Sequence, residues 1–566
     1  MVCGQCGASN PEGMRFCGQC GAPLGRSCPA CGAPAAESNR FCGQCGAALG
    51  SVRAAPVAER RVCSVLFVDL VGFTPLAEAR DPEDVRELLS RYFERARTAV
   101  GRYGGTVEKF IGDAVMAVWG TPVAFEGDAE RAVRAGLELV DLVAALGVEW
   151  GLPGLAARAG VVTGEVAVTL GASGEGMVAG DPVNTAARVQ AAAPAGTVLV
   201  DEPTRRAAGP SVAFEDVGVH GLKGKADGQP LWRALRVVSW VGATRPADGL
   251  EAPLCGRDPE LRGLKDLLHA GVDRRQARLV WVTGPAGVGK SRLAWELEKY
   301  VDGLAQAMLW HRGRCLSYGE GAAFGALGEM VRQRFGIADE DASDVAARKL
   351  AEGVTRFVAD PAERSYVGVR LGRLLGVSAE DDGGGPLARE ELFAGWRLLF
   401  ERLAAVAPVV LVVDDAQHAD PGLLDFLEHL VDWSRAAAIL VVVLARTEGE
   451  LDRARVGRNR SVVRLEPLDR AAMVALVSGL VPGLPAAAVD TVAERAHGLP
   501  LFAVETVRAL LEAGVVVRGA DRRYDVRGDL GSVAVPDSLH GLLAARLDGL
   551  PPGLRSLAAD AAVMGG

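Results

Sequence analysis

The chain has 566 residues, of which 49% are hydrophobic and 23% charged, and its formal net charge is −9. This length exceeds what one hydrophobic core organises, so we expect roughly three or four domains. The acidic balance argues against a protein that coats nucleic acid, because phosphate attraction requires a basic excess. The longest apolar runs, such as Ala436–Ala445, have about half of the ~20 residues that a membrane span needs, and the first residues lack the pattern of a signal peptide. We therefore expect a cytoplasmic protein without a membrane segment.

Eight of the 11 cysteines lie within the first 45 residues, as two CxxC-x10-CxxC units that share the sequence Arg-Phe-Cys-Gly-Gln-Cys-Gly. Four thiolates on two tight turns match the tetrahedral preference of Zn²⁺. A disulfide framework is the alternative, and a cytoplasmic chain disfavours it. The region 1–50 resembles a double zinc ribbon, in which we expect two structural Zn²⁺ ions and a structural role or a protein partner. The candidate zinc ligands are Cys3, Cys6, Cys17, Cys20, Cys28, Cys31, Cys42 and Cys45.

After a linker near residues 47–60, strand and helix patterns alternate, which predicts an α+β sandwich. We expect helices from Pro82 to 104, over 128–146 and from 184 onward, and strands at 62–69, around 111–113, at 158–162, 165–170, 197–201, 212–217 and 231–235.

Two carboxylates fall at the ends of strands in this region. Asp69 closes the apolar run 65–68, and Asp113 lies in a tight turn between two short strands. Carboxylates brought together at strand ends can hold a pair of Mg²⁺ ions on a nucleotide's phosphates. Further on, Asn184 and Arg188 are four residues apart and share one helix face. Taken singly, Asp69 could instead cap a helix, and Asn184 with Arg188 could be an ordinary surface pair.

Together with Lys109, these residues make the region 58–236 resemble the catalytic domain of class III nucleotidyl cyclases, which has a ferredoxin-like α+β fold. The resemblance implies a homodimer that converts ATP to 3′,5′-cyclic AMP and pyrophosphate. It implies that Asp69, Asp113 and the Leu70 carbonyl hold two Mg²⁺ or Mn²⁺ ions. In the same family, the residue at Arg188 stabilises charge at the α-phosphate and the residue at Asn184 aligns the ribose.

Two positions govern the choice of base in this family. Lys109 is the residue type of adenylate-forming members. The second position lies seven residues before Asn184, at Met177, where adenylate-forming members carry Asp or Thr. Met177 has no strong hydrogen-bond acceptor, which weakens adenine selectivity, and Glu175 is an alternative source of that contact.

A phosphate-binding loop follows in the second half of the chain. The apolar run 277–282 leads into a GxxxxGK[ST] sequence, whose residues Gly284, Gly287, Gly289, Lys290 and Ser291 we expect to cradle phosphates and Mg²⁺. A second apolar run, 409–413, ends in Asp414 and Asp415. We expect Asp414 to contact the Mg²⁺ through water and Asp415 to lie beside the γ-phosphate.

Cys255-Gly256-Arg257, Arg446 after an apolar run and Pro500 in Gly-Leu-Pro make this half resemble the signalling ATPases of the STAND group, within the AAA-related class. The resemblance implies a linker at 237–252, an α/β P-loop NTPase over 253–455 and a helical lid with the start of a winged-helix region over 456–566. It implies that ATP or ADP binds there, with Arg446 as a nucleotide sensor and Pro500 near the adenine. Arg446 could instead be a surface arginine. Such ATPases continue into helical repeats, so we expect a C-terminal sensor, another potential partner-binding part, to be missing.

The predicted function is therefore an adenylate cyclase regulated by a fused ATPase module, in a multidomain chain of mixed α+β and α/β class. The alternative is a nucleotide-switched regulator whose cyclase domain only dimerises. Nucleic-acid binding through the zinc ribbons is disfavoured by the acidic charge. The isolated thiols Cys63, Cys255 and Cys315 are expected to be buried by packing.

Overall fold

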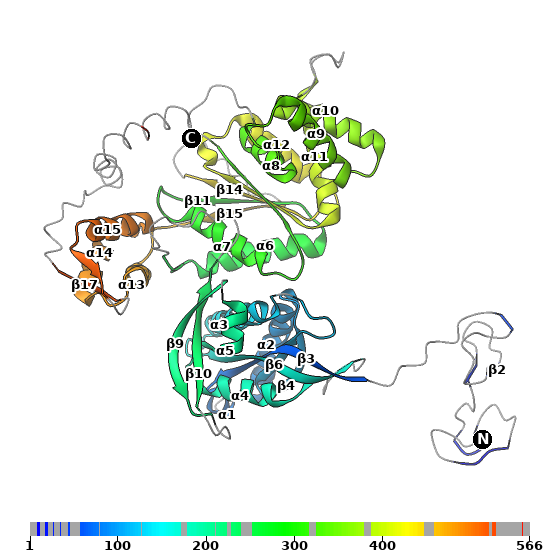
Figure 1. The fold of residues 1–566 in the computed structure, drawn as a ribbon, viewed down its shortest axis with the longest axis vertical. Helices are drawn as coiled ribbons and strands as arrows, with labels where there is room; N and C mark the ends of the chain where they lie inside the picture. Colours follow the sequence, from blue (N-terminus) through cyan, green and yellow to red (C-terminus); the bar gives the residue numbers. More distant parts are fainter. Residues whose placement is uncertain are drawn as a thin grey trace. The chain divides into compact units, whose positions relative to one another are not determined.

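The computed structural model of the chain (Figure 1) divides into two compact units, one formed by most of the chain up to Leu235 and one by most of the chain from Arg236 onward. The structure describes residues 8–11, 17–20, 26–27, 34–35, 44–45, 57–238, 252–527 and 557, apart from 79, 126, 171–177, 210, 223–227, 316–323, 378–386, 447–457 and 520–522.

The first unit is built on an eight-stranded sheet with the strand order β4-β5-β3-β6-β8-β10-β9, and β7 pairs with β6 at its side. Its strands are β3 (Val57–Val71), β4 (Thr106–Ile111), β5 (Ala114–Trp119), β6 (Ala156–Leu170), β7 (Val178–Ala179), β8 (Val198–Asp201), β9 (Val212–His220) and β10 (Gln229–Val237). Its helices are α1 (Phe73–Glu78), α2 (Pro82–Arg102), α3 (Asp128–Glu149), α4 (Asp181–Ala192) and α5 (Glu202–Ala208).

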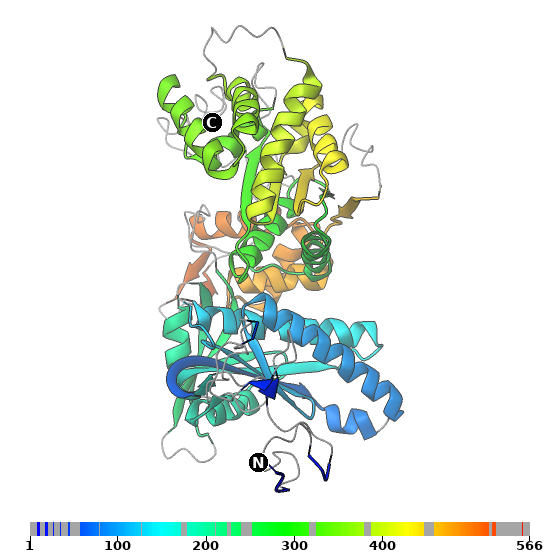
Figure 2. The ribbon, with the colours of Figure 1, turned by 90° about the vertical axis from the view of Figure 1, so that its right-hand side faces the viewer.

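Helices cover both faces of this sheet, because alternate residues of its central strand point to opposite sides. Val65 and Phe67 of β3 share a core with Val189 of α4. Leu66 points the other way and lies next to Gly136 of α3. On that second face α2 runs beside α3 (Figure 2), and Arg95 and Glu149 join the two helices by an ion pair of 2.8 Å. The order β4-β5-β3-β6 is that of a ferredoxin-like core.

Two boundaries in this unit differ from the sequence prediction. The predicted strands 158–162 and 165–170 are one continuous strand, β6, which pairs with β3 along its whole length. Gly164 does not make a turn there. A Cβ on it would lie 2.8 Å from Pro182, so this glycine permits close contact between β6 and the start of α4. The helix that carries Asn184 starts three residues earlier than predicted, at Asp181, with Pro182 in its first turn.

The second unit contains a parallel five-stranded sheet with the order β12-β13-β14-β11-β15. The strands are β11 (Arg278–Thr283), β12 (Leu309–Arg314), β13 (Val409–Asp414), β14 (Ile439–Ala445) and β15 (Arg460–Arg464), and a separate hairpin is formed by β16 (Val516–Arg518) and β17 (Tyr524–Val526). The helices are α6 (Asp258–Arg274), α7 (Lys290–Asp302), α8 (Gly325–Phe335), α9 (Ser343–Phe357), α10 (Pro361–Leu375), α11 (Arg389–Val406), α12 (Pro421–Trp433), α13 (Arg470–Leu480), α14 (Ala486–Arg495) and α15 (Pro500–Glu512).

The buried, almost wholly apolar strands β13 and β14 are typical of a parallel sheet that helices cover on both faces. Helices α8 to α12 share one large core with the sheet. Helices α13 to α15 form a second core, against which Val526 of β17 packs. Mixed α+β and α/β architecture was the predicted class, and it is confirmed. The helices α8 to α11, inserted between β12 and β13, were not predicted.

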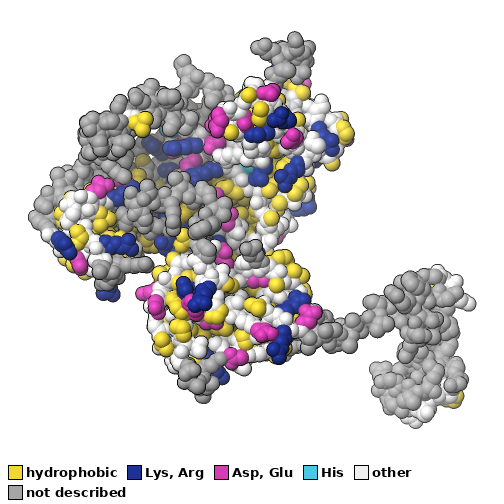
Figure 3. Space-filling model, in the orientation of Figure 1, with side chains coloured by type: hydrophobic (Ala, Val, Ile, Leu, Met, Phe, Trp, Pro, Cys, Tyr) yellow, Lys and Arg dark blue, Asp and Glu magenta, His cyan; other side chains and the backbone are white. Residues whose placement is uncertain are grey.

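No helix among the described residues has the length and apolar character required to cross a bilayer. On the face of the molecule shown in Figure 3, acidic and basic side chains are interspersed over the first unit.

Candidate functional site

The two predicted metal-binding carboxylates meet in the first unit. Asp69 lies two residues before the end of β3, and Asp113 lies in the turn between β4 and β5. Antiparallel pairing of β3 with β5 brings this turn next to the end of β3. The Asp113 carboxyl lies close to that of Asp69 and to the backbone of Leu70. Burial raises the pKa of Asp113, and the neighbouring charge of Asp69 raises it further.

Asp69 has two further partners that the sequence did not predict. Its Oδ2 accepts hydrogen bonds from Nη2 of Arg158 at 3.1 Å and from Nε2 of Gln190 at 3.2 Å. Arg158 lies directly opposite Asp69 in the antiparallel register of β3 and β6. Only this strand register shows that Arg158 is a partner of Asp69. The register is set by the folded sheet and cannot be inferred from the local spacing of residues in the sequence.

The remaining predicted cyclase residues lie on β4 and α4. Lys109 is half-buried on β4, next to a bulge that begins at Val107. On α4, Asn184 is exposed and Arg188 half-buried, one helical turn apart. Among the hydrogen bonds and ion pairs of the described residues, none joins these three side chains to the acid pair within one chain. Met177 lies outside the described residues, and so does Glu175.

The phosphate-binding loop of the second unit joins β11 to α7, as predicted. Gly287 and Gly289 adopt φ values of 76° and 106°, which lie in the region that favours glycine. Nζ of Lys290 donates hydrogen bonds to the carbonyl oxygens of Gly284 and Pro285, both at 2.9 Å. Burial and the nearby charge of Arg446 lower the pKa of Lys290. An ammonium group held in the loop in this way is placed to turn toward an incoming phosphate.

Asp414, at the end of β13, lies beside this loop. Its Oδ1 accepts from the Ser291 hydroxyl at 3.2 Å, so the two side chains expected to serve one Mg²⁺ ion are adjacent. Its Oδ2 accepts from Arg312 of β12 at 2.5 Å. Arg312 was not predicted as part of the site.

The next acid, Asp415, has partners of its own. It accepts from Arg314 of β12 and from Gln417, both at 3.0 Å. Burial raises the pKa of Asp415, but the hydrogen bonds from Gln417 and Arg314, together with the charges of Arg314 and Arg446, more than offset this, so that its pKa is lowered. Arg314, like Arg312, belongs to a strand whose role the sequence did not indicate.

A cavity of about 470 Å³ adjoins the phosphate-binding loop. Lys290, Ser291 and Asp415 line one part of it, together with Arg446, which directly follows β14. The other part is apolar and includes Pro500 at the start of α15. The backbone N–H of Leu501 reaches the Gly287 carbonyl at 3.2 Å, which ties α15 to the loop. The structure therefore brings the predicted phosphate, sensor and adenine-side residues to one cavity.

The isolated cysteines behave differently from one another. Cys63 and Cys315 are buried, as predicted, and burial raises their pKa values to about 11 and about 12. The prediction for Cys255 holds in part, because this residue packs against the core of α13 to α15 but is only half-buried and also lines the cavity beside the phosphate-binding loop. It precedes Gly256, whose φ of 63° turns the chain there.

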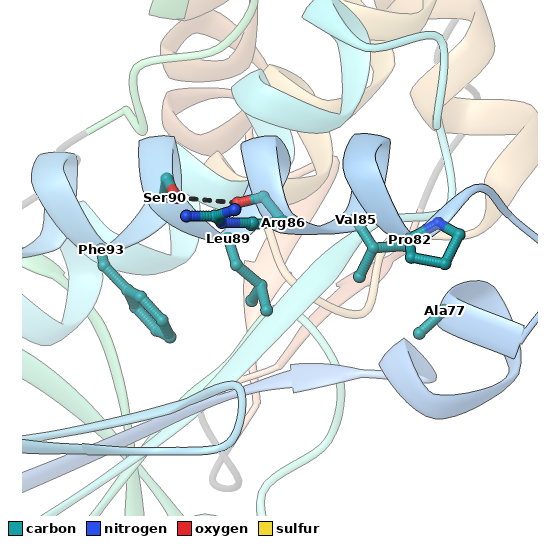
Figure 4. A pocket seen from close by; sticks show the side chains of 7 residues that line it. All are labelled: Ala77, Pro82, Val85, Arg86, Leu89, Ser90 and Phe93. Atoms are coloured by element: carbon teal, nitrogen blue, oxygen red, sulfur yellow. Dashed lines mark hydrogen bonds between the residues drawn. The ribbon is translucent and has the colours of Figure 1, made fainter.

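A second pocket, of about 430 Å³, lies between α1 and α2 of the first unit (Figure 4). Val85, Leu89 and Phe93 of α2 line it on one side and Ala77 of α1 on the other. Its polar contact is internal, from the Ser90 hydroxyl to the Arg86 carbonyl at 2.8 Å. Arg86 also lines the pocket, so the lining combines apolar contact with one guanidinium group and offers no carboxylate or histidine for acid–base catalysis.

Three of the eight candidate zinc ligands are described. Cys17 is buried, and its Sγ accepts from the backbone N–H of Gln19 at 3.4 Å and from Asn10 at 3.5 Å. Cys20 and Cys45 are exposed. Contacts from N–H groups to a cysteine sulfur suit a thiolate ligand. The other five candidates, Cys3, Cys6, Cys28, Cys31 and Cys42, lie outside the described residues.

Family models match the chain in three consecutive places. A double zinc ribbon model matches residues 3–46, an adenylate and guanylate cyclase catalytic domain matches 56–233, and an AAA ATPase domain matches 253–443. The chain therefore contains these three domains, in the order that the sequence predicted.

Individual relatives are similar over parts of the chain. An uncharacterized protein of Rhizobium meliloti is 31% identical over 69% of this chain and 38% of its own length, and Adenylate cyclase 1 of the same organism is 31% identical over 33% of this chain and 29% of its own length. The chain thus spans about a third of the length of these relatives. Among solved structures, the adenylyl cyclase CyaB from P. aeruginosa is 29% identical over 32% of this chain and 96% of its own, with a TM-score of 0.31. The guanylyl cyclase Cya2 is 30% identical over 32% of this chain and 95% of its own, with a TM-score of 0.30.

Proposed function

We propose that the protein is an adenylate cyclase that forms 3′,5′-cyclic AMP and pyrophosphate from ATP as a homodimer, under the control of its ATPase domain. The observation that carries this proposal is the contact between Asp69 and Asp113 at the end of β3. It lies within the matched cyclase catalytic domain. The relative named Adenylate cyclase 1 supports adenine as the base, as does Lys109.

The acid pair fits a divalent cation. Two carboxyls lie in contact there, and the raised pKa of Asp113 reflects burial and the charge of Asp69. A cation between such groups offsets the repulsion of like charges, and oxygen ligands suit Mg²⁺ and Mn²⁺. Asp69, Asp113 and the Leu70 carbonyl would hold two such ions. Bound there, the ions would lower the pKa of the ribose 3′-hydroxyl and neutralise charge on the departing pyrophosphate.

The other residues would bind and orient the nucleotide. Arg188 would neutralise charge at the α-phosphate, and Asn184, on the same face of α4, would align the ribose. Lys109 would donate to a ring nitrogen of adenine. In a homodimer the acid pair of one subunit would face Lys109, Asn184 and Arg188 of the other, which agrees with the lack of a described contact between the two sets within one chain. Met177 would be the second position near the base.

The second unit would bind ATP or ADP in the cavity beside the phosphate-binding loop. Lys290 would contact the β- and γ-phosphates, while Ser291 and Asp414, already adjacent, would hold the Mg²⁺. Arg446 would sense the γ-phosphate, with Pro500 near the adenine. We expect Lys290→Ala to weaken ATP binding by at least about tenfold, because charge-assisted contacts to phosphate are lost. Titration with a fluorescent ATP analogue measures this, and unchanged affinity would remove Lys290 from this role.

The N-terminal domain would bind two structural Zn²⁺ ions through its eight cysteines. Small domains of this kind depend on metal in place of a large core. A protein partner is the ligand that the ribbons would recognise. Metal analysis of the purified protein tests the proposal, which requires about two zinc ions per chain.

The cyclase activity is tested by incubating purified protein with ATP or GTP and Mg²⁺ or Mn²⁺, followed by chromatography of the products. We expect cyclic AMP from the wild type and at least about a thousandfold less from Asp69→Asn, because this substitution removes one ligand charge with little change of shape. Cyclic GMP as the main product would overturn adenine selectivity. If wild type and Asp69→Asn are equally inactive while ATP still binds the second unit, the enzyme proposal fails and the nucleotide-switched regulator is favoured.

A further inference from the structure

Asp69 is held by one of its two carboxylate oxygens. Arg158 and Gln190 both donate to Oδ2, at 3.1 and 3.2 Å. Because both donors bind Oδ2, they fix the orientation of the carboxylate without using Oδ1. The side chains of Arg158 and Asp69 are only 33% and 21% exposed, so this ion pair is partly shielded from water.

The two donors are themselves fixed by the backbone. Arg158 stands opposite Asp69 on β6, and its Nη1 donates to the Ala191 carbonyl at the end of α4 at 3.2 Å. Gln190 is buried at 7% exposure. Its helix lies directly against β6 at Gly160, where a Cβ would come within 2.3 Å of the Gln190 backbone nitrogen. A residue larger than glycine at position 160 would push α4, and Gln190 with it, away from Asp69.

We propose that Arg158 and Gln190 are positioning residues that orient Asp69 for metal binding. The inference rests on the proposed function, since it assumes that the acid pair is the cation site. Partners that fix a metal-binding side chain typically contribute about 10- to 100-fold in metal affinity or activity. Both donors connect Asp69 to α4, the helix that also carries Asn184 and Arg188. Asp69 and these two candidate phosphate and ribose ligands are thus tied to one rigid element in each subunit.

Gln190→Met is the sharpest test, because methionine keeps the volume of glutamine, removes its donor and changes no charge. Mn²⁺ is titrated into the full-length protein without nucleotide, and free Mn²⁺ is followed by electron paramagnetic resonance. The Mn²⁺ ions lost in Asp69→Asn are assigned to the acid pair. We expect Gln190→Met to raise the dissociation constant of these ions about tenfold. Gln333→Met is the matched control: its amide donates to Glu329 in the second unit at 3.1 Å, so Mn²⁺ binding at the acid pair should be unchanged.

The dependence of the cyclase rate on Mn²⁺ concentration gives a second measurement. It would not change if Arg158 and Gln190 had only a structural role. With ATP as substrate, the cyclase rate of Gln190→Met should fall more at low than at saturating Mn²⁺. Arg158→Lys, which keeps the charge but loses the paired N–H donors, should shift Mn²⁺ binding in the same direction and serves if Gln190→Met does not fold. Wild-type Mn²⁺ affinity in folded Gln190→Met and Arg158→Lys, with binding still lost in Asp69→Asn, would overturn the positioning role alone. Unchanged binding in Asp69→Asn would instead overturn the cation site of the proposed function.

Discussion

Each unit of the protein places two aspartates at the end of a strand, but the two acid pairs are balanced differently. In the second unit each acid has its own arginine: Arg312 binds Asp414 and Arg314 binds Asp415. In the first unit Arg158 binds Asp69, while Asp113 contacts Asp69 itself and has a raised pKa. The second pair is therefore stable without a cation, whereas the first is crowded by like charge. Crowding of this kind costs stability and favours metal binding.

Replacing one acid in each pair should change the free energy of unfolding in opposite directions. The replacement in the first unit should in addition have the largest effect of all, on the cyclase rate. Asp113→Asn should reduce the cyclase rate by about a thousandfold or more, because a metal ligand is lost. At pH 7 it should also raise the free energy of unfolding by about 1 kcal/mol, because a neutral amide avoids the repulsion from Asp69 and can donate to it. Asp414→Asn should lower the free energy of unfolding by about 1–2 kcal/mol, because Arg312 loses its ionised partner.

Product assays and denaturant unfolding in metal-free buffer check these expectations. The second unit's transition is identified as the one whose shift on adding ATP is lost in Lys290→Ala, since a ligand stabilises only the unit that binds it and Lys290 belongs to the second unit. Destabilisation by Asp113→Asn, or stabilisation by Asp414→Asn, would reverse the comparison between the two acid pairs.

The two units should also respond oppositely to acid. His311, buried on β12, accepts from Nε of Arg334 at 2.8 Å, and burial together with the Arg334 charge lowers its pKa to about 3. Between the ordinary histidine pKa of about 6.5 and this value, the unfolded chain binds a proton that the folded chain does not. The second unit should therefore lose about 1.4 kcal/mol per pH unit below pH 6 from this group.

Asp113 acts in the other direction. Its folded pKa is raised, so its contribution to stability is present at low pH and is lost as the pH rises through that pKa. Unfolding at a series of pH values should show the second unit weakening relative to the first below pH 6. His311→Gln keeps an acceptor for Arg334 but does not titrate, and it should abolish the relative weakening. A pH slope that persists in His311→Gln would assign the effect to other groups.

The sequence predicted those features of the two sites that depend on local spacing. The phosphate-binding loop is one continuous segment, and Asp414 directly ends an apolar strand, so both could be placed without the fold. Arg158 and Arg312 could not, because each meets its aspartate only through the pairing of neighbouring strands: Arg158 stands opposite Asp69, and Arg312 lies two residues before the residue opposite Asp414. Gln190 joins them through a helix whose approach depends on Gly160. The single strand β6 was predicted as two strands because Thr163-Gly164 has the composition of a turn. The glycine at position 164 is instead explained by the close contact of β6 with Pro182.

The smallest expected effect concerns Tyr92, a fully buried residue of α2. Its hydroxyl has no hydrogen-bond partner among the described residues. Burial raises the pKa of Tyr92, and the charges of Asp113 and Asp69 raise it further, so the crowding of the first acid pair extends to this phenol. An unsatisfied buried hydroxyl is unfavourable, so Tyr92→Phe should raise the free energy of unfolding of the first unit by about 1 kcal/mol.

The matched substitution is Tyr366→Phe in the second unit, where the hydroxyl donates to the Glu391 carbonyl at 3.5 Å near the surface. Losing this long, exposed contact should lower stability by no more than about 0.5 kcal/mol. Denaturant unfolding of both variants measures the difference in sign. If Tyr92→Phe destabilises the first unit, its hydroxyl has a partner in solution and adds no unsatisfied polar group beside the acid pair. If it stabilises the unit as expected, Tyr92 adds an unsatisfied hydroxyl beside the crowded acid pair, in contrast to the arginine-paired acids beside the phosphate-binding loop.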